Sequence, residues 1–327
     1  MPHRIAILTG PTAVGKTEVA LLVAEALDAE IVSADSMAVY RGLEVATAKP
    51  SPEQRARVPH HLIDVADPRC PFTVADYRQL ALRAIADIAS RGRLPLIVGG
   101  TRLYIVALTS GFFEGPGADP NLRRRLQELA LREGPEVLHR QLAQVDPDTA
   151  ARLAPRDLKR IIRALEVFEL TGTPISQLQA ESQRTTPPCQ GPMVALIRDR
   201  AELYRRIDAR ADAMIEAGLE REVRSLLDAG LDEHLTALQG HGYKELIGYL
   251  KGRYDRNEAI RLLKRNTRRY AKRQLSWLRQ EKSVEFVDAS APPGEVASRV
   301  VSLLKLRLST QPQIRSAQQS PSRPDTP

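Results

Sequence analysis

The first hundred residues alternate between two hydrophobic patterns. Short apolar runs typical of buried strands occupy residues 3–9 (HRIAILT), 30–35 (EIVSAD) and 94–101 (LPLIVGGT). Between them, residues 18–27 and 73–90 space their apolar positions as amphipathic helices do. Strands that alternate with helices predict an α/β fold, in which helices cover both faces of a parallel sheet.

The pattern changes near Gly111. Residues 111–120 are loop-like, and residues 120–180 have helical patterns that break at 134–135, 146–147 and 172–174. A linker rich in proline and glycine (185–192) precedes a new strand pattern, MVALI at 193–197. We therefore predict a helical insertion, residues 115–190, into a core formed by residues 1–114 and 191–308.

The core should continue with helices at about 200–230 and 256–280 and a last strand at 283–288. Residues 309–327 are polar and lack apolar periodicity, which predicts a disordered tail.

A phosphate-binding loop follows the first strand. GPTAVGKT at 10–17 fits the pattern GxxxxGK[ST] between a strand and a helix, the context that this motif requires. Backbone amides there can surround phosphate oxygens at the positive end of a helix. The Thr17 hydroxyl is a candidate Mg²⁺ ligand. The expected phosphate-binding residues are Gly10, Thr12, Ala13, Val14, Gly15, Lys16 and Thr17.

Two further strand ends should meet this loop. Ligands of parallel sheets bind beyond the carboxyl ends of the strands, where Asp35, Ser36 and Gly99–Gly100–Thr101 fall. Asp35 can hold Mg²⁺ through water, act as a general base or cap a helix. Thr101 can cap a helix or contact a reactant. The strand at 94–101 lacks the terminal acid of P-loop nucleotidases, which weakens a nucleotide-hydrolysing role.

Charge is concentrated in one segment. The net charge is +8, and residues 251–282 hold twelve Lys or Arg against three Asp or Glu. Such an excess indicates a polyanionic partner or a solvated helix face. The apolar positions expected to face the core are Ile260, Leu263, Thr267, Tyr270, Trp277 and Leu278. We interpret Trp277 as core rather than as a stacking platform.

Location is constrained by what the chain lacks. No apolar run approaches the roughly 18 residues of a membrane span. Two cysteines, Cys70 and Cys189, cannot form a disulfide framework or a four-thiolate zinc site. We expect a cytoplasmic protein.

Seven segments occur in an order that resembles one enzyme family. They are GPTAVGKT, ADSMAVYRGLEVATAKP, PHHLID, VGGTRLY, RALEV, LYRRIDAR and RYAKRQLSWLR. Together they resemble the tRNA dimethylallyltransferases over about residues 4–288. The sequence departs from the commoner pattern at Val14, at Ala46 and in HGYK at 241–244, which affects at most local tRNA contacts.

The resemblance implies a reaction. Such enzymes transfer a dimethylallyl group from dimethylallyl diphosphate to the exocyclic amine of the adenosine 3′ of the anticodon, in tRNAs that read codons beginning with U. Asp35 would be the base, Thr101 would lie at the reacting centre, and Arg210 would bind diphosphate with Lys16. The enzyme would use Mg²⁺ and act as a monomer.

The resemblance also implies the tRNA contacts. The insertion would clasp the anticodon stem, and Asp35 and Thr101 would also contact the tRNA. The other expected tRNA-binding residues are Ser36, Met37, Ala38, Arg123, Lys159, Arg160, Ile161, Ile162, Arg163, Gln239, Gly240, His241, Gly242, Tyr243 and Lys244.

Three alternatives remain open from the residues. A P-loop small-molecule kinase explains the phosphate loop and Asp35 but leaves the basic helix unexplained. An RNA-stimulated ATPase explains both features without transfer chemistry. A non-catalytic RNA-binding module would have no use for an intact phosphate loop.

Overall fold

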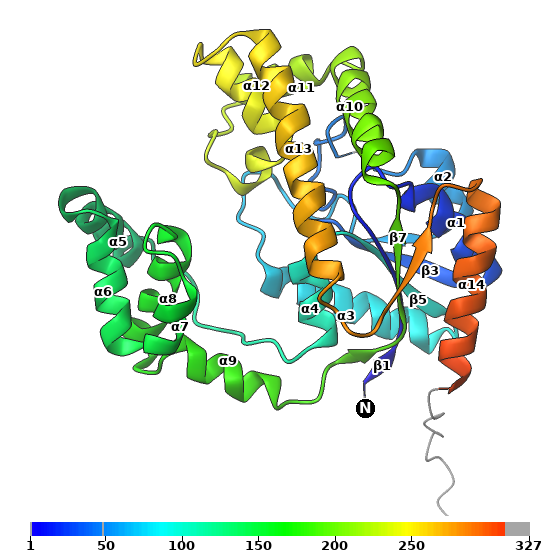
Figure 1. Ribbon diagram of the computed structural model, residues 1–327, viewed down its shortest axis with the longest axis horizontal. Helices are drawn as coiled ribbons and strands as arrows, with labels where there is room; N and C mark the ends of the chain where they lie inside the picture. The colour runs from blue at the N-terminus through cyan, green and yellow to red at the C-terminus, as the bar shows by residue number, and fades with distance from the viewer. Residues whose placement is uncertain (1, 48, 311–327) are drawn as a thin grey trace, which may run out of the picture.

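A six-stranded parallel sheet lies at the centre of the molecule (Figure 1). The computed structural model describes residues 2–47 and 49–310. The strand order is β4 (His60–His61), β3 (Ala29–Ala34), β5 (Leu94–Gly99), β2 (Ala6–Thr9), β7 (Met193–Ile197) and β8 (Val284–Asp288). Gly99 pairs with both Ala34 and Thr9, so three strands end at one level. The predicted α/β fold is confirmed.

Alternate residues of these strands face two separate hydrophobic clusters. Ile7 and Ile97 pack with α3 (Val74–Ser90), α4 (Arg102–Thr109) and the long helix α13 (Arg256–Leu278). Leu8 and Leu96 pack on the other face with α1 (Lys16–Ala26) and α14 (Pro293–Thr310). Both faces of the sheet are therefore covered, as expected for a parallel sheet.

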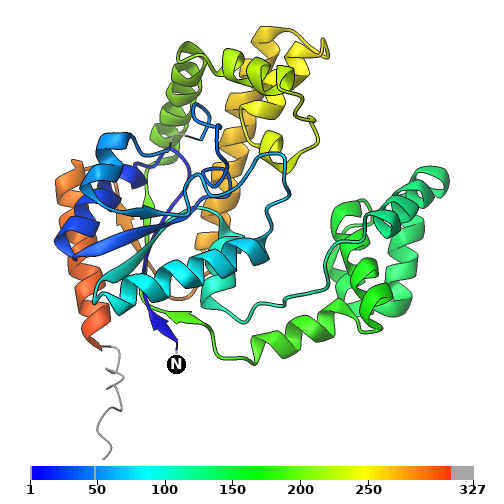
Figure 2. The ribbon, with the colours of Figure 1, turned by 180° about the vertical axis from the view of Figure 1, so that it is seen from behind.

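Five helices stand apart from the sheet (Figures 1 and 2). They are α5 (Pro120–Glu133), α6 (Pro135–Val145), α7 (Pro147–Arg152), α8 (Leu158–Thr171) and α9 (Ile175–Gln183). They have a hydrophobic core of their own, which includes Leu138, Leu142 and Ile161, all fully buried. The three helix breaks predicted from the sequence are confirmed.

The chain leaves and re-enters the core through one narrow contact. A Cβ atom on Gly111 would lie 1.7 Å from the Ser182 carbonyl oxygen, so only glycine fits where the outgoing and returning segments touch. The returning segment then forms β6 (Cys189–Gln190), which pairs in parallel with β1 (His3–Arg4). The predicted linker at 185–192 thus contains a short strand.

The remaining helices surround one end of the sheet. They are α2 (Pro52–Arg57), α10 (Arg200–Glu216), α11 (Leu219–Asp228), the 3₁₀ turn η1 (Thr236–Gln239) and α12 (Tyr243–Leu250). The single helix expected at 200–230 is two helices, because Gly218 has a φ of 92° and ends the helical path. None of the helices described in residues 2–47 and 49–310 combines the length and apolarity that a membrane crossing needs.

The C-terminal helix corrects the predicted tail. Helix α14, which the sequence pattern did not predict, packs Val300 and Leu304 against the sheet and extends to Thr310. Ser309 and Thr310 therefore end a helix, so the prediction of disorder is wrong for these two residues. The rest of the predicted tail, residues 311–327, lies outside the described residues.

Candidate active site

The phosphate-binding loop connects β2 to α1 in a conformation that its small residues permit. Gly10, Ala13 and Gly15 have φ values of 145°, 64° and 106°. A Cβ atom on Gly10 would come within 2.6 Å of the Leu196 carbonyl oxygen. The Val14 side chain is fully buried against the sheet, so only its backbone can serve the site.

Cationic side chains gather around this loop. Lys16 Nζ donates to the carbonyl oxygens of Gly10 (3.0 Å) and Pro11 (2.8 Å). Burial lowers the pKa of Lys16 to about 8, with Asp35 opposing the shift and Arg210 adding to it. Two arginines that sequence reasoning missed hold the loop from outside, since Arg206 donates to Ala13 O (2.9 Å) and Arg198 to Val14 O (3.1 Å).

Asp35 lies at the end of β3 with its two oxygens in different roles. Oδ1 accepts from the backbone N–H groups of Met37 (2.8 Å) and Ala38 (3.3 Å), and so caps a turn. No hydrogen bond to Oδ2 is found among the described residues, although Asp35 lines the clefts described below. The structural and the chemical interpretations of Asp35 are therefore compatible.

Thr101 does not cap its helix. It occupies the N-cap position of α4 without a side-chain capping bond, and its Oγ1 instead accepts from Ser36 N (3.1 Å). This contact ties the end of β5 to the turn that carries Asp35. Nearby, burial raises the pKa of Tyr270 to about 12; the Asp35 charge adds to this shift, and a hydrogen bond with Thr101 opposes it.

Two clefts meet at this edge of the sheet. The phosphate-loop cleft, of about 440 Å³, is lined by Gly15, Lys16, Thr17 and Arg206 among others. The apolar cleft, of about 230 Å³, is lined by nonpolar side chains from α10 and α13, Ile207, Ala211, Met214 and Leu263, together with polar residues. Both clefts share Thr12, Ala13, Asp35, Thr47, Arg210 and Tyr270.

Arg210 lies at the junction of the clefts. Desolvation lowers its pKa, and the charge of Asp35 opposes this shift. An anion in the phosphate-loop cleft would therefore meet Arg210, Lys16 and the amino terminus of α1 together.

Oxygen-bearing side chains beside the phosphate-binding loop could hold a magnesium ion, which would neutralise phosphate charge. No cluster of three His, Cys, Asp or Glu suited to a metal ion occurs in the part of the chain that the structure describes. Thr17 and Asp35 both line the phosphate-loop cleft. Mg²⁺ usually takes one or two protein ligands and completes its shell with phosphate oxygens and water.

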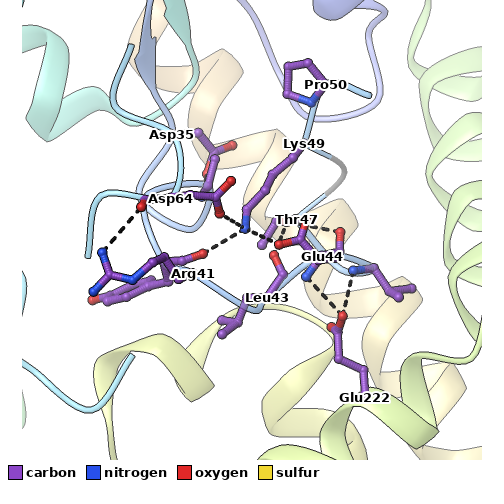
Figure 3. Close-up of polar contacts among 12 residues, drawn as sticks. Asp35, Arg41, Leu43, Glu44, Thr47, Lys49, Pro50, Asp64 and Glu222 are labelled. Atoms are coloured by element: carbon purple, nitrogen blue, oxygen red, sulfur yellow. Dashed lines mark hydrogen bonds and ion pairs between the residues drawn. The ribbon is translucent and has the colours of Figure 1, made fainter. Parts of the chain in front are cut away.

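Residues 40–47 and 49–50 lie beside the clefts, where Thr47 lines both and Ala46 lines the apolar one, and they are anchored on two sides (Figure 3). Lys49 Nζ is nearly inaccessible and donates to Tyr40 O (2.8 Å), Glu44 Oε1 (2.8 Å) and Asp64 Oδ1 (2.5 Å). From α11, Glu222 accepts from the N–H groups of Glu44 and Val45, both at 3.0 Å. These bonds hold Ala46 and Thr47 over the clefts.

Sequence reasoning found the segment but not its anchors. TAKP is part of the resemblance, whereas Asp64 and Glu222 follow no local pattern. The signal in the sequence was that this segment carries part of the resemblance although no helix or strand is predicted for it. Such a segment needs contacts from elsewhere in the fold to hold it in place.

Two of the sequence segments expected to contact tRNA come together. A Cβ atom on Gly240 would touch Met37 Cε at 2.6 Å, and the His241 ring lies 5.3 Å from that of Tyr270. Gln239, Gly240 and His241 line the apolar cleft with Ser36 and Met37. Two of the expected residues, Ala38 and Tyr243, are buried, and the Tyr243 hydroxyl donates to Glu222 (2.8 Å). Their side chains therefore stabilise these two segments from beneath.

The other expected tRNA contacts lie in the insertion. Arg123 and Arg163 both donate to Glu166, which is fully buried and also accepts from Asp119 N. Lys159 and Arg160 are exposed. Ile161 and Ile162 are buried in the insertion core, so their side chains support this surface rather than form it.

Segment 251–282, which contains α13, pairs its cations unevenly with acidic side chains. Cations paired with acids are Lys251, Arg253, Arg256, Arg261, Lys264 and Arg268. Cations with no salt bridge among the described residues are Arg265, Arg269, Lys272, Arg273, Arg279 and Lys282. The amino-terminal half is therefore largely neutralised, and free charge is concentrated towards the carboxyl end.

Some residues on the apolar side of α13 pack in the hydrophobic core, and others line the apolar cleft. Leu263, Trp277 and Leu278 are buried, which confirms Trp277 as core. The prediction is wrong for Thr267 and Tyr270, which line the apolar cleft instead of facing only the core. The Arg273 guanidinium lies 5.8 Å from the centre of the Tyr270 ring.

Comparison with known proteins gives consistent matches. The family model described as IPP transferase matches residues 38–281, and that described as isopentenyl transferase matches residues 3–64. The tRNA dimethylallyltransferase 1 of Trichlorobacter lovleyi is 50% identical, covering 88% of this chain and 94% of its own. The tRNA dimethylallyltransferase of Thermotoga maritima is 46% identical, covering 92% and 98%.

Solved structures agree. The tRNA isopentenylpyrophosphate transferase of Bacillus halodurans has a TM-score of 0.71 and 39% identity, covering 94% of this chain and 97% of its own. A eukaryotic dimethylallyltransferase acting on tRNA has a TM-score of 0.73 and 27% identity, covering 88% and 74%. Because the family model covers residues 38–281 and half of the 287 residues aligned with the Trichlorobacter lovleyi relative are identical, this chain belongs to the family of IPP transferases, the tRNA dimethylallyltransferases.

Proposed function

We propose that this enzyme transfers a dimethylallyl group from dimethylallyl diphosphate to the exocyclic amine of the adenosine 3′ of the anticodon, in tRNAs that read codons beginning with U. Diphosphate is the other product. The supporting observation is the meeting of two clefts at Asp35, Arg210 and Tyr270, one cationic and one lined largely by nonpolar side chains.

The cationic cleft suits the leaving group. As the bond from carbon to oxygen stretches, negative charge develops on the diphosphate and positive charge on the allylic carbon. Lys16, Arg210 and the loop amides stabilise the former, as preorganised electrostatic catalysis requires. Mg²⁺, held by Thr17 with Asp35 nearby, would neutralise further phosphate charge. Nonpolar Ile207, Met214 and Leu263 would hold the prenyl tail away from water.

Asp35 suits the base. The acceptor amine is a poor nucleophile because its lone pair is delocalised into the purine ring. Asp35 Oδ1 is fixed by two amides, so the orientation of the carboxylate is set before the substrate arrives. Oδ2 can then take the proton as the carbon–nitrogen bond forms. Thr101, bonded to Ser36 and adjacent to Tyr270, would position the acceptor.

The tRNA would be held on two sides. We propose that the insertion (115–190) clasps the anticodon stem through Arg123, Lys159, Arg160 and Arg163. Residues 35–38 and 239–244 would receive the adenosine, which must be splayed out of the loop. Gly242 and Lys244 belong to this second surface. A monomer in the cytoplasm would suffice for this reaction.

The test is mass spectrometry of tRNA nucleosides after incubation with dimethylallyl diphosphate and Mg²⁺. A mass gain of one prenyl unit on a single adenosine is expected. RNA-stimulated phosphate release from ATP, or phosphorylation of a small metabolite, without a modified base would instead favour the nucleotidase or kinase alternatives.

A further inference from the structure

A buried glutamine on α13 connects the two glycine loops of the site. Gln274 is 6% exposed. Its Oε1 accepts from Thr12 N in the phosphate-binding loop, and its Nε2 donates to Gly100 O beyond β5, both at 2.9 Å. The backbone partners determine the orientation of the carboxamide, because one is only a donor and the other only an acceptor.

The contact with Gln274 leaves no room for a side chain at Gly100. A Cβ atom there would lie 2.2 Å from Gln274 Nε2 and 3.0 Å from Gly10 O. Any other residue at position 100 would push the carboxamide out or separate the two loops. The approach of the loops and the position of Gln274 therefore depend on each other.

The connection reaches the reacting groups. Gly100 directly precedes Thr101, and Thr12 lines both clefts together with Asp35 and Arg210. Tyr270, one helical turn before Gln274, lies on the same side of α13 and lines the same clefts. Two successive turns of α13 thus contact the loops that follow two different strands.

We propose that Gln274 is a positioning residue: its carboxamide sets the distance between the phosphate-binding loop and the Gly99–Gly100–Thr101 turn. The inference rests on the proposed function, because it assigns the leaving diphosphate to the first loop and the acceptor amine to the side of the second. Alignment of the two reactants then depends on two hydrogen bonds of Gln274. One joins it to Gly100, 174 residues away in sequence, and the other to Thr12, 262 residues away. Misplacement of reactants by about 1 Å can cost about 100-fold in rate.

The first test replaces the carboxamide by a carboxyl group, whose ability to donate a hydrogen bond depends on pH. In Gln274→Glu, a protonated carboxyl can accept from Thr12 N–H and donate to Gly100 O, as glutamine does, whereas a carboxylate faces the Gly100 carbonyl with no proton to give. We expect the ratio of the variant's kcat to that of the wild type to rise as pH falls from 8 to 5. The ratio cancels any pH dependence that the two enzymes share, and a flat ratio would overturn the proposal.

The second test removes both bonds. Gln274→Met keeps the length of the side chain but neither hydrogen bond, so kcat at saturating tRNA and donor should fall by about 10- to 100-fold. Affinity for tRNA should change less than twofold. Gln280→Met, at an exposed position just after the same helix, is the matched control and should behave as wild type.

The outcomes are distinguishable. A folded Gln274→Met enzyme with wild-type kcat would refute the positioning role. If this variant does not fold, the pH profile of Gln274→Glu decides. A wild-type enzyme that prenylates no tRNA would instead refute the proposed function, whatever the variants do.

Discussion

At the residue scale, the charge of Lys16 makes diphosphate binding depend on pH. Its pKa is lowered to about 8, chiefly by burial. The lysine is therefore charged below about pH 8 and loses its charge as pH rises through that value. We predict that affinity for inorganic pyrophosphate in the free enzyme falls above pH 8, by at most about tenfold per pH unit for one linked proton.

Lys16→Ala is the matching variant. It should lose this pH dependence and be almost inactive at every pH, because the leaving group loses one of the cations that would stabilise its charge. Isothermal titration with pyrophosphate and a turnover assay measure the two effects. Near-normal kcat in this variant would remove the phosphate-binding loop from the chemistry.

Asp35 can be separated into its two roles. Asn in place of Asp35 keeps an oxygen for the amides of Met37 and Ala38 but removes the base. We predict that Asp35→Asn and Asp35→Ala both lower kcat by about 10²- to 10⁴-fold, and that only Asp35→Ala also weakens tRNA binding, because the turn is lost. Single-turnover rates and filter binding test this. Weakened affinity with an unchanged saturating rate in both variants would make Asp35 a positioning residue.

The residues that sequence could reveal are those whose chemistry is local. Glycine spacing and a lysine define a phosphate loop within eight residues, and Asp35 ends a recognisable strand. Gln274, Glu222 and Lys49 could not be found in this way, because their partners are backbone groups or side chains brought together only by the fold. The hydrogen bond between Thr12 and Gln274 spans 262 residues.

At the element scale, α13 should hold tRNA through its free charges only. Arg269 and Arg273 have no acidic partner among residues 2–47 and 49–310, whereas Lys251 and Arg253 both pair with Glu233. We predict that the double variant Arg269→Ala/Arg273→Ala lowers the slope of log K against log salt for tRNA binding by about 2, since each arginine that neutralises a phosphate accounts for roughly one unit of slope.

The matched control is Lys251→Ala/Arg253→Ala, which removes the same formal charge from the same segment. Its slope should stay within about half a unit of the wild type, because both side chains are engaged by Glu233, whose charge offsets one of the two cations. Equal effects in the two double variants would mean that the net charge of segment 251–282, rather than the position of each cation in it, attracts the tRNA.

Elements were predictable where their periodicity was strong. The apolar strands and the amphipathic α13 were found because burial forces a pattern onto the sequence. The break between α10 and α11 was missed because one glycine inside a helical pattern is usually tolerated, and its φ of 92° cannot be read from sequence. Helix α14 lies beyond the segments that carried the resemblance.

At the scale of the whole molecule, two hydrophobic cores are joined by a thin connection. The sheet has its two clusters, and the insertion has a third, centred on Leu138, Leu142 and Ile161. At the crossing of Gly111 and Ser182 the connecting segments come so close that no side chain fits. Independent stability of the insertion follows, because a separate core can be lost without opening the sheet.

Glu166 is the residue through which this independence can be tested. Burial alone would raise its pKa, but hydrogen bonds from Arg123 and Arg163 hold the pKa below its ordinary value. Glutamine keeps only one of the two oxygens that accept from Arg123, Arg163 and Asp119 N, and its amide group is a donor that faces arginines. Because both arginines are partly exposed, water offsets part of the loss, and we expect Glu166→Gln to destabilise the insertion by about 1–3 kcal/mol.

Amide hydrogen exchange shows which helices and strands lose stability in this variant. In Glu166→Gln, amides of α5 and α8 should exchange faster while those of β2 and β5 keep their wild-type rates. Affinity for tRNA should fall and affinity for pyrophosphate should not. Glu169→Gln, which breaks the exposed pair with Arg125, is the control and should change neither. If exchange in the sheet accelerates together with that in the insertion, the two cores unfold as one unit, and tRNA binding could not be tuned in the insertion without cost to the catalytic core.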